Sequence, residues 1–189
     1  MADIISIEYG STYHIYHRGV NSCTLFQDEG NFRYFLKLYS KYIPQVADTY
    51  AWILMGNHFH FLLRIKKECE ILPFPPLQPP LGSANSKGVP LPTRKPVPSH
   101  QLSHLFNSYA QAFNKRKNRT GHLFECPFHR KKVESREYFM NLALYIHTNP
   151  RHHKFNIPFS EYLWSSYTDI LKTYHENPSY HEVIQAFGS

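Results

Sequence analysis

The sequence has little cysteine, and its cysteines are not arranged for cross-linking. Only three occur in 189 residues, at positions 23, 69 and 126, and no Cys-x-x-Cys is present. An odd, scattered set argues against a disulfide framework or a zinc ribbon and is typical of a reducing compartment. The chain also lacks an apolar run long enough to cross a bilayer. Its first residues lack the basic start and apolar core of a signal peptide. We therefore expect a soluble cytoplasmic protein that contacts no membrane.

The chain has fewer acidic than basic residues: 14 Asp and Glu against 21 Lys and Arg, which gives a formal net charge of +7. Between residues 115 and 132 there is one acid, Glu125, and there are seven basic residues: Lys115, Arg116, Lys117, Arg119, Arg130, Lys131 and Lys132. We call residues 115–132 the basic window. Phenylalanines and His122 are interleaved with these charges, which is typical of a surface that follows phosphates and stacks bases. The alternative is a solvated basic loop.

Proline is concentrated in one part of the chain. Nine of the 14 prolines lie between Pro73 and Pro98, mixed with Gly, Ser, Asn and Lys. Neither a helix nor a central strand tolerates that density of proline. The pattern predicts an exposed insertion over residues 66–98, with a proline-rich docking segment as the alternative.

Hydrophobic periodicity and turn residues predict the remaining elements. Strands are expected at 13–17, 49–55, 58–65 and 129–133, and helices from a cap at Asp28 or Asn31 to 42, at 100–116 after a Ser99 cap, at 135–147 and near 165–174. The order strand, helix, strand, strand, helix, strand is the ferredoxin-like split β-α-β pattern. It predicts an α+β fold: an antiparallel sheet with two helices on one face and a helical C-terminal extension.

The histidines of His58-Phe59-His60 form the strongest local motif. Because side chains alternate along a strand, His58 and His60 share one face while Phe59 lies on the other. Two adjacent imidazoles can hold a divalent cation or orient a phosphate. In a chain with 13 histidines, a pair that binds no metal is the competing interpretation. The pair is expected near the edge of the sheet, where a ligand can approach.

Six stretches of the chain carry a resemblance to a known family. They are Tyr13–Asn21, Met55–His60, Ser108–Arg116, Thr120–Phe124, Tyr145–Pro150 and Trp164–Tyr167. In this order they resemble the HUH-type single-tyrosine transposases, in the branch of the REP-associated tyrosine transposases. The resemblance implies a catalytic domain over 1–134, interrupted by the proline-rich insertion, with residues 135–189 as a helical extension packed on it.

The resemblance also implies a chemistry. Tyr109, on the helix before the basic window, is expected as the nucleophile that forms a 5′-phosphotyrosine with DNA, although its periodicity with Leu102, Phe106 and Phe113 is that of a core residue. Mg²⁺ or Mn²⁺ is expected on His58 and His60. The family places a polar ligand about one turn after the tyrosine. Phe113 occupies that position here, so Asn114, or otherwise Gln111, is expected to complete the site.

The expected partner is single-stranded or hairpin DNA, bound by a monomer or homodimer that would associate with the nucleoid. Its contacts are expected from Arg18, Asn21, Lys115, Arg116, Lys117, Arg119, His122, Arg130, Lys131 and Lys132. The leading hypothesis is a metal-dependent strand transferase that cuts and rejoins DNA. The alternatives are a catalytically inactive module that binds DNA hairpins, a metal-dependent nuclease that uses water, and a protein whose histidines are structural.

Overall fold

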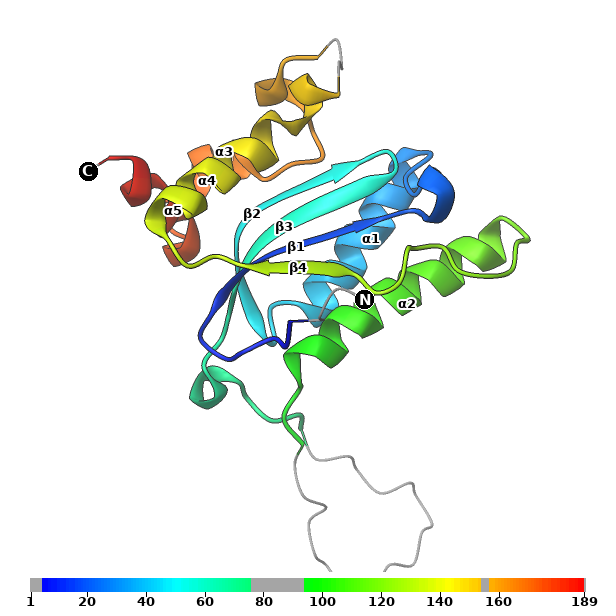
Figure 1. Cartoon of the computed structure of the whole chain (residues 1–189), viewed down its shortest axis with the longest axis horizontal. Helices are drawn as coiled ribbons and strands as arrows, with labels where there is room; N and C mark the ends of the chain where they lie inside the picture. The colour runs from blue at the N-terminus through cyan, green and yellow to red at the C-terminus, as the bar shows by residue number, and fades with distance from the viewer. Residues whose placement is uncertain (1–4, 76–93, 154–156, 189) are drawn as a thin grey trace, which may run out of the picture.

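A computed structural model describes residues 5–75, 94–153 and 157–188 (Figure 1). Of the expected insertion over residues 66–98, only the two ends fall within these ranges, and 76–93 lie outside the described residues. Within the described ranges, no helix combines the length and the apolar character needed to cross a membrane.

Four strands form one antiparallel sheet in the order β2-β3-β1-β4. They are β1 (Thr12–Arg18), β2 (Ala47–Met55), β3 (His58–Ile65) and β4 (His129–Lys132). Helix α1 (Glu29–Tyr42) connects β1 to β2, and helix α2 (Pro98–Arg116) precedes β4. This arrangement confirms the predicted α+β fold with its split β-α-β order. The histidine pair does not lie on an edge strand, since β3 is interior, but it lies at the end of β3 that follows the hairpin turn.

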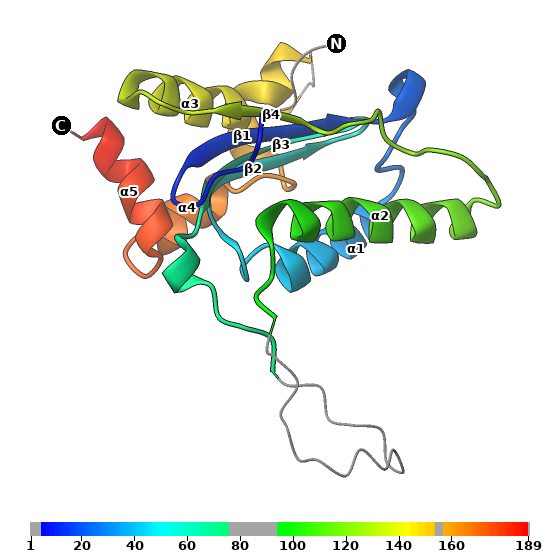
Figure 2. The same ribbon diagram turned by 60° about the horizontal axis from the view of Figure 1, so that its bottom comes forward.

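Helices cover both faces of the sheet (Figure 2). Helices α1 and α2 pack together under one face, where alternate residues of β1 and β3 form the main core with them. Helix α3 (Arg136–His152) lies across the opposite face against β2 and β3, over a second apolar cluster. We call these the α1/α2 face and the α3 face.

The helices begin largely where the sequence predicts. Asp28 caps α1 by accepting a hydrogen bond from the backbone N–H of Asn31, and Ser135 caps α3 through the N–H of Tyr138. Helix α2 begins one residue before the expected Ser99 cap, with Val97 as its N-cap and Pro98 in its first turn. Proline fits there because the first-turn N–H groups have no partner within a helix.

Helix α3 does not end before Asn149-Pro150, as the sequence had indicated, but continues to His152 with Pro150 inside it. Only two residues follow the proline in the helix, so the lack of a proline N–H removes a hydrogen bond only near the end of the helix and destabilises it little. Asn149 and Pro150 are both buried. The consequence is that Asn149 is helical and lies one turn after Tyr145.

The C-terminal residues form α4 (Tyr167–Thr173), as expected, and α5 (Pro178–Phe187), which was not predicted. Helix α5 packs against β2 and α3. Trp164 stacks on Phe32 of α1 with ring centroids 4.4 Å apart, and its carbonyl accepts a hydrogen bond from the N–H of Leu54. The segment before α4 is therefore fastened to the sheet.

Candidate functional site

The α3 face carries a row of histidines at one end of the sheet. His58 and His60 lie two residues apart on β3, and their ring centroids are 5.2 Å apart. His14 of neighbouring β1 stacks on His60 at 5.1 Å, with 2.9 Å between its Nε2 and Nδ1 of His60. All three side chains are buried. The prediction that His58 and His60 share a face is confirmed, and they lie opposite Phe59 and Phe61.

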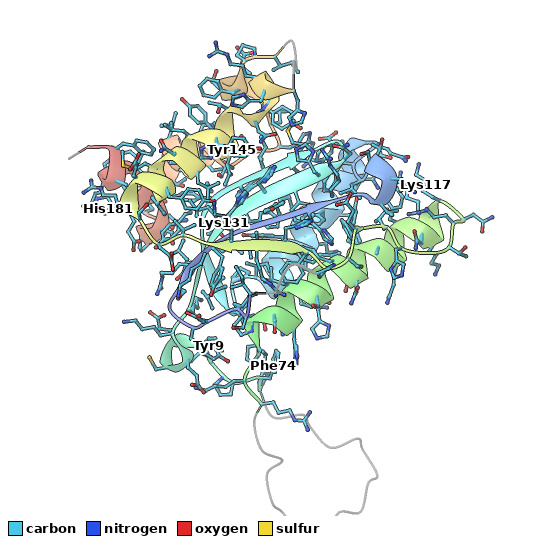
Figure 3. The ribbon with its side chains drawn as sticks, viewed as in Figure 1. Tyr9, Phe74, Lys117, Lys131, Tyr145 and His181 are labelled. Carbon is cyan, nitrogen blue, oxygen red and sulfur yellow. The ribbon has the colours of Figure 1, made fainter. Side chains whose placement is uncertain are left out.

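Helix α3 brings two further polar side chains to this pair. Oδ1 of Asn149 lies 3.4 Å from Nε2 of His58. One turn earlier, the ring of Tyr145 meets the ring of His60 edge-on at 5.5 Å, because residues four apart share a helix face. Tyr145 keeps 39% of its surface exposed, and Figure 3 shows it on α3 beside the sheet. We call His58, His60, Tyr145 and Asn149 the histidine–tyrosine site.

Burial keeps these imidazoles neutral. It lowers the pKa of His58 and of His14 to about 4 each, with Lys131 contributing at His14. The pKa of His60 falls to about 2, through burial and then through the neighbouring His14 and His58. A neutral imidazole presents a nitrogen lone pair. Near pH 7 the site therefore offers lone pairs rather than positive charge.

Hydrogen bonds fix how one of the pair presents its nitrogens. Oδ1 of Asn57 accepts a hydrogen bond at 2.7 Å from Nδ1 of His58, so the hydrogen of the neutral ring is on Nδ1. Nε2 of His58 is then an acceptor, and it faces the acceptor Oδ1 of Asn149. The buried Nδ2 of Asn149 has no hydrogen-bond partner. Nε2 of His58 and Oδ1 of Asn149 therefore face each other as two acceptors with no hydrogen between them, and a cation bound between them would interact favourably with both.

A divalent metal fits this set of donors. Two imidazole nitrogens and one amide oxygen leave further coordination positions open for a ligand or water. Across the described parts of the chain, no cluster of three or more His, Cys, Asp or Glu side chains is arranged to hold a metal. An amide therefore supplies the third candidate ligand here.

Tyr109, the expected nucleophile, lies elsewhere. It belongs to α2 on the α1/α2 face, separated by the sheet from His58 and His60, and only 1% of its surface is exposed. Its hydroxyl donates a 2.6 Å hydrogen bond to the carbonyl of Leu25, and burial raises its pKa. Phe26 and Phe35 pack against its ring. The structure does not bring Tyr109 together with the histidine pair, and its surroundings are those of a core residue.

The expected third ligands, Gln111 and Asn114, also lie on α2. Both line a pocket between α2 and residues 121–130, away from the pair. Nδ2 of Asn114 donates to the carbonyl of Gly121 at 2.9 Å. The structure therefore separates all three α2 residues from the metal site that they were expected to serve.

The expected DNA contacts divide among several surfaces. Arg18 ends β1 opposite His58 in register, while Asn21 is exposed in the following turn with a positive φ of 52°. The other eight residues belong to three groups: Lys115, Arg116 and Lys117 end α2, Arg119 and His122 follow in the loop, and Arg130, Lys131 and Lys132 form β4. Lys117 lies at the end of α2 distant from Tyr145 (Figure 3).

Alternation along β4 separates its three cations. Lys131 pairs with His14 in register and shares the α3 face, with its ammonium 4.6 Å from the ring centre of Tyr138. Arg130 and Lys132 lie on the other face, and Lys132 forms an ion pair with Glu8. Arg116 pairs with Asp28. The basic window is thus not one continuous phosphate track. Among the predicted DNA contacts, Arg18 and Lys131 lie on the same face of the sheet as the histidines.

Neither Tyr145 nor Asn149 is among the site residues predicted from the sequence. Both lie in the stretch Tyr145–Pro150, one of the six that resemble the transposases. The signal that could have found them is spacing: a polar residue follows Tyr145 by four positions, whereas Phe113 follows Tyr109. The expected helix end at Asn149-Pro150 obscured that spacing.

Comparisons with known proteins give one structural likeness. No family model and no curated protein matches the sequence. The fold is similar to the solved structure of a REP-associated tyrosine transposase bound to a REP hairpin, with a TM-score of 0.63 and 11% sequence identity. The alignment covers 91% of this chain and 86% of that one. The two chains therefore share a fold.

Proposed function

We propose that this chain is a metal-dependent DNA strand transferase that acts on single-stranded or hairpin DNA, with Tyr145 as its nucleophile. His58, His60 and Asn149 would hold Mg²⁺ or Mn²⁺. Two imidazoles supply more nitrogen than Mg²⁺ usually prefers, so we expect Mn²⁺ to bind more tightly. The proposal places half of the site on α3, within the region that the sequence assigned to an extension.

One observation carries the proposal: α3 brings a solvent-accessible tyrosine and a buried amide, one turn apart, to the paired histidines. The ring centre of Tyr145 lies 5.5 Å from that of His60, so a phosphate bound at the histidine end of β3 would lie near this tyrosine. Further support comes from the likeness to a transposase solved with a DNA hairpin, and from the net positive charge of the chain.

The reaction exchanges one phosphodiester for another. The phenol oxygen of Tyr145 loses its proton and attacks phosphorus, while the bond from phosphorus to the 3′ oxygen breaks. The 3′ oxygen takes up a proton and leaves as a hydroxyl, and the 5′ phosphate stays on the tyrosine. Attack by a second 3′ hydroxyl reverses these steps and releases Tyr145. No energy cofactor is needed, since the number of ester bonds is unchanged.

The chain's own residues prepare this exchange. A tyrosine with an ordinary pKa is about one part in a thousand ionised at pH 7, so the phosphate must be made more electrophilic. Bound at the histidine–tyrosine site, the divalent ion supplies that polarisation as a Lewis acid. Asn57 directs the lone pair of His58 Nε2 toward the site. Arg18 and Lys131 lie on the same face as the histidines and would contact flanking phosphates.

A covalent-trapping experiment tests the proposal. Single-stranded hairpin oligonucleotides carrying a 3′ label are incubated with the protein and Mn²⁺ and run on a denaturing gel. Because the 5′ phosphate stays on the protein, we expect the 3′ label to move to protein size and a 5′ label to appear on a shorter free strand. EDTA, Tyr145→Phe and Asn149→Ala should each remove the shifted band, and Tyr109→Phe should keep it.

Other results would select the alternatives. Cleaved DNA without a shifted band, persisting in Tyr145→Phe, would indicate a nuclease that uses water. Hairpin binding without either product, whichever metal is added, would indicate an inactive recognition module. A shifted band that survives Tyr145→Phe and disappears with Tyr109→Phe would overturn the assignment of the nucleophile.

A further inference from the structure

The α1/α2 face carries a pocket that the proposed chemistry does not use. It measures about 740 Å³ and lies between α2 and residues 121–130. His17 of β1 lines it from the sheet, on the opposite side of the sheet from His58 and His60. We call it the α2 pocket. Its volume is that of sites for small organic ligands.

Aromatic rings form one side of the α2 pocket. His17 stacks on Phe124 with ring centroids 4.5 Å apart and an interplanar angle of 15°, and Phe106 meets His17 at 5.2 Å. The ring of Phe128 lies 5.3 Å from that of Phe106. Phe128 and Arg130 complete this side, with the guanidinium carbon 4.7 Å from the ring centre. Such a surface suits a flat ring.

The pocket also presents polar atoms that lack partners. Nδ1 of His17, Oδ1 of Asn114 and Nε of Arg130 are buried, and none has a hydrogen-bond partner. Buried polar atoms are normally paired, because an unmet donor or acceptor loses its hydration without compensation. These three atoms come from β1, α2 and β4, and all three residues line the same pocket. A ligand with hydrogen-bonding edges would satisfy them.

Arg130 adds a charge requirement. It is half-buried, burial lowers its pKa, and no described carboxylate forms an ion pair with it. A partly buried guanidinium without an acid is matched to an anion, most directly to a phosphate. The occupant should therefore combine a flat ring, hydrogen-bonding edge atoms and a phosphate.

We propose that the α2 pocket binds one unpaired nucleotide of the DNA, with its base on the aromatic side and its phosphate at Arg130. The base edge would meet His17 and Asn114. This inference rests on the proposed function for the nature of the nucleic acid. Since β4 is an edge strand, a single strand can pass around it from the pocket to the α3 face. The bound nucleotide is thus distinct from the one that Tyr145 attacks, and it would select which unpaired base flanks the cut.

An abasic scan tests the pocket. Affinity is measured by fluorescence anisotropy for a hairpin with single-stranded flanks, one flanking base being removed at a time, using the Tyr145→Phe protein so that cleavage plays no part. We expect one position at which removal of the base weakens binding about 5- to 150-fold, the range for stacking of one base on aromatic side chains. In Phe128→Ala and in Ala110→Phe, which fills the pocket, that dependence should disappear.

The control is Lys172→Gln, which removes one exposed charge from α4, away from the pocket. It should keep the position dependence. If the dependence survives in both pocket variants, or if no position shows one, the proposal is wrong. Thermal melting of each variant identifies any variant that fails to fold. If Phe128→Ala does not fold, Ala110→Phe still tests the pocket.

A second measurement separates this inference from the proposed function. NMR signals of the His17 and Arg130 side chains are followed during addition of single deoxynucleoside 5′-monophosphates. Deoxyribose 5-phosphate and inorganic phosphate are the controls. We expect the nucleotides to shift both residues and the two controls to shift at most Arg130. Equal shifts with deoxyribose 5-phosphate would overturn the pocket, whereas a protein that binds nucleotides but never cleaves DNA would overturn only the strand-transfer proposal.

Discussion

Tyr109 and Tyr145 lie on opposite faces of the same sheet, and the two faces give one kind of side chain two different surroundings. On the α1/α2 face, two helices pack over the sheet, and the hydroxyl of Tyr109 donates its hydrogen bond to the carbonyl of Leu25. On the α3 face, one helix covers β2 and β3, and Tyr145 stays accessible beside His60. Two tyrosines on helices that cover the same sheet thus differ in burial and in hydrogen bonding, and their neighbours in sequence do not reveal the difference.

The largest expected effect comes from removing one hydroxyl on the α3 face. Tyr145→Phe should reduce covalent capture of DNA at least about a thousandfold, since the reacting atom is lost. Tyr109→Phe, the matched change on the other face, should leave capture within about twofold. Quantitative gel measurement of the protein–DNA band checks both. Equal losses in the two variants would remove the distinction between the faces.

The next effect concerns metal affinity. His14→Phe removes the partner of His60 Nδ1 and should weaken Mn²⁺ binding about 10- to 100-fold, as losses of such supporting hydrogen bonds usually do. Binding stabilises the folded state, so Mn²⁺ should raise the melting temperature of the wild type and raise that of His14→Phe only at higher concentration. A melting temperature indifferent to Mn²⁺ in the wild type would favour structural histidines.

The third effect is on the free energy of unfolding, and it should be larger for the change at Tyr109 than for the change at Tyr145. Tyr109→Phe leaves the buried carbonyl of Leu25 without this donor and should lower the free energy of unfolding by about 1–2 kcal/mol. Tyr145→Phe, at an exposed position, should change it by less than about 0.5 kcal/mol. Urea unfolding without added metal measures both. The reverse ranking would contradict the burial that separates the two residues.

A fourth effect sharpens the comparison through the pH dependence of stability. Burial lowers the pKa of His17 on the α1/α2 face to about 3. Between pH 6.5 and 3, His17 is therefore protonated in the unfolded chain and neutral in the folded chain. Stability from this residue is present above pH 6.5 and is lost as pH falls, by about 1.4 kcal/mol per unit. In His17→Phe, unfolding measured at pH 7 and pH 5 should show a smaller difference than in the wild type. An unchanged difference would mean that His17 titrates normally.

Local patterns were sufficient for much of the fold. The alternation of His58, Phe59 and His60 correctly divided the two faces, and the caps at Asp28 and Ser135 correctly placed two helices. The periodicity of Tyr109 with Leu102, Phe106 and Phe113 correctly indicated a core residue. These features depend on neighbours within one turn or one strand, so one sequence contains them.

The place of Tyr145 beside the histidines could not be predicted in the same way. Which helix covers which face is decided by packing between residues far apart in the chain, and nothing near Tyr145 states that α3 crosses β3. Preference for the tyrosine closest to the basic window therefore selected Tyr109, which lies on the opposite side of the sheet from His58 and His60. Pro150 also led to the prediction that the helix ends at Asn149-Pro150, because a proline usually ends a helix, whereas here it lies buried inside α3.

The division of the histidine–tyrosine site between β3 and α3 has a consequence for how the protein comes into being. His58 and Asn149 are 91 residues apart in the sequence, so the histidines are synthesised well before the helix that carries the tyrosine and the amide. A growing or truncated chain that lacks α3 has neither Tyr145 nor Asn149 beside the histidines. Under the function proposed above, such a chain would form no phosphotyrosine until α3 had been synthesised and had docked on the sheet.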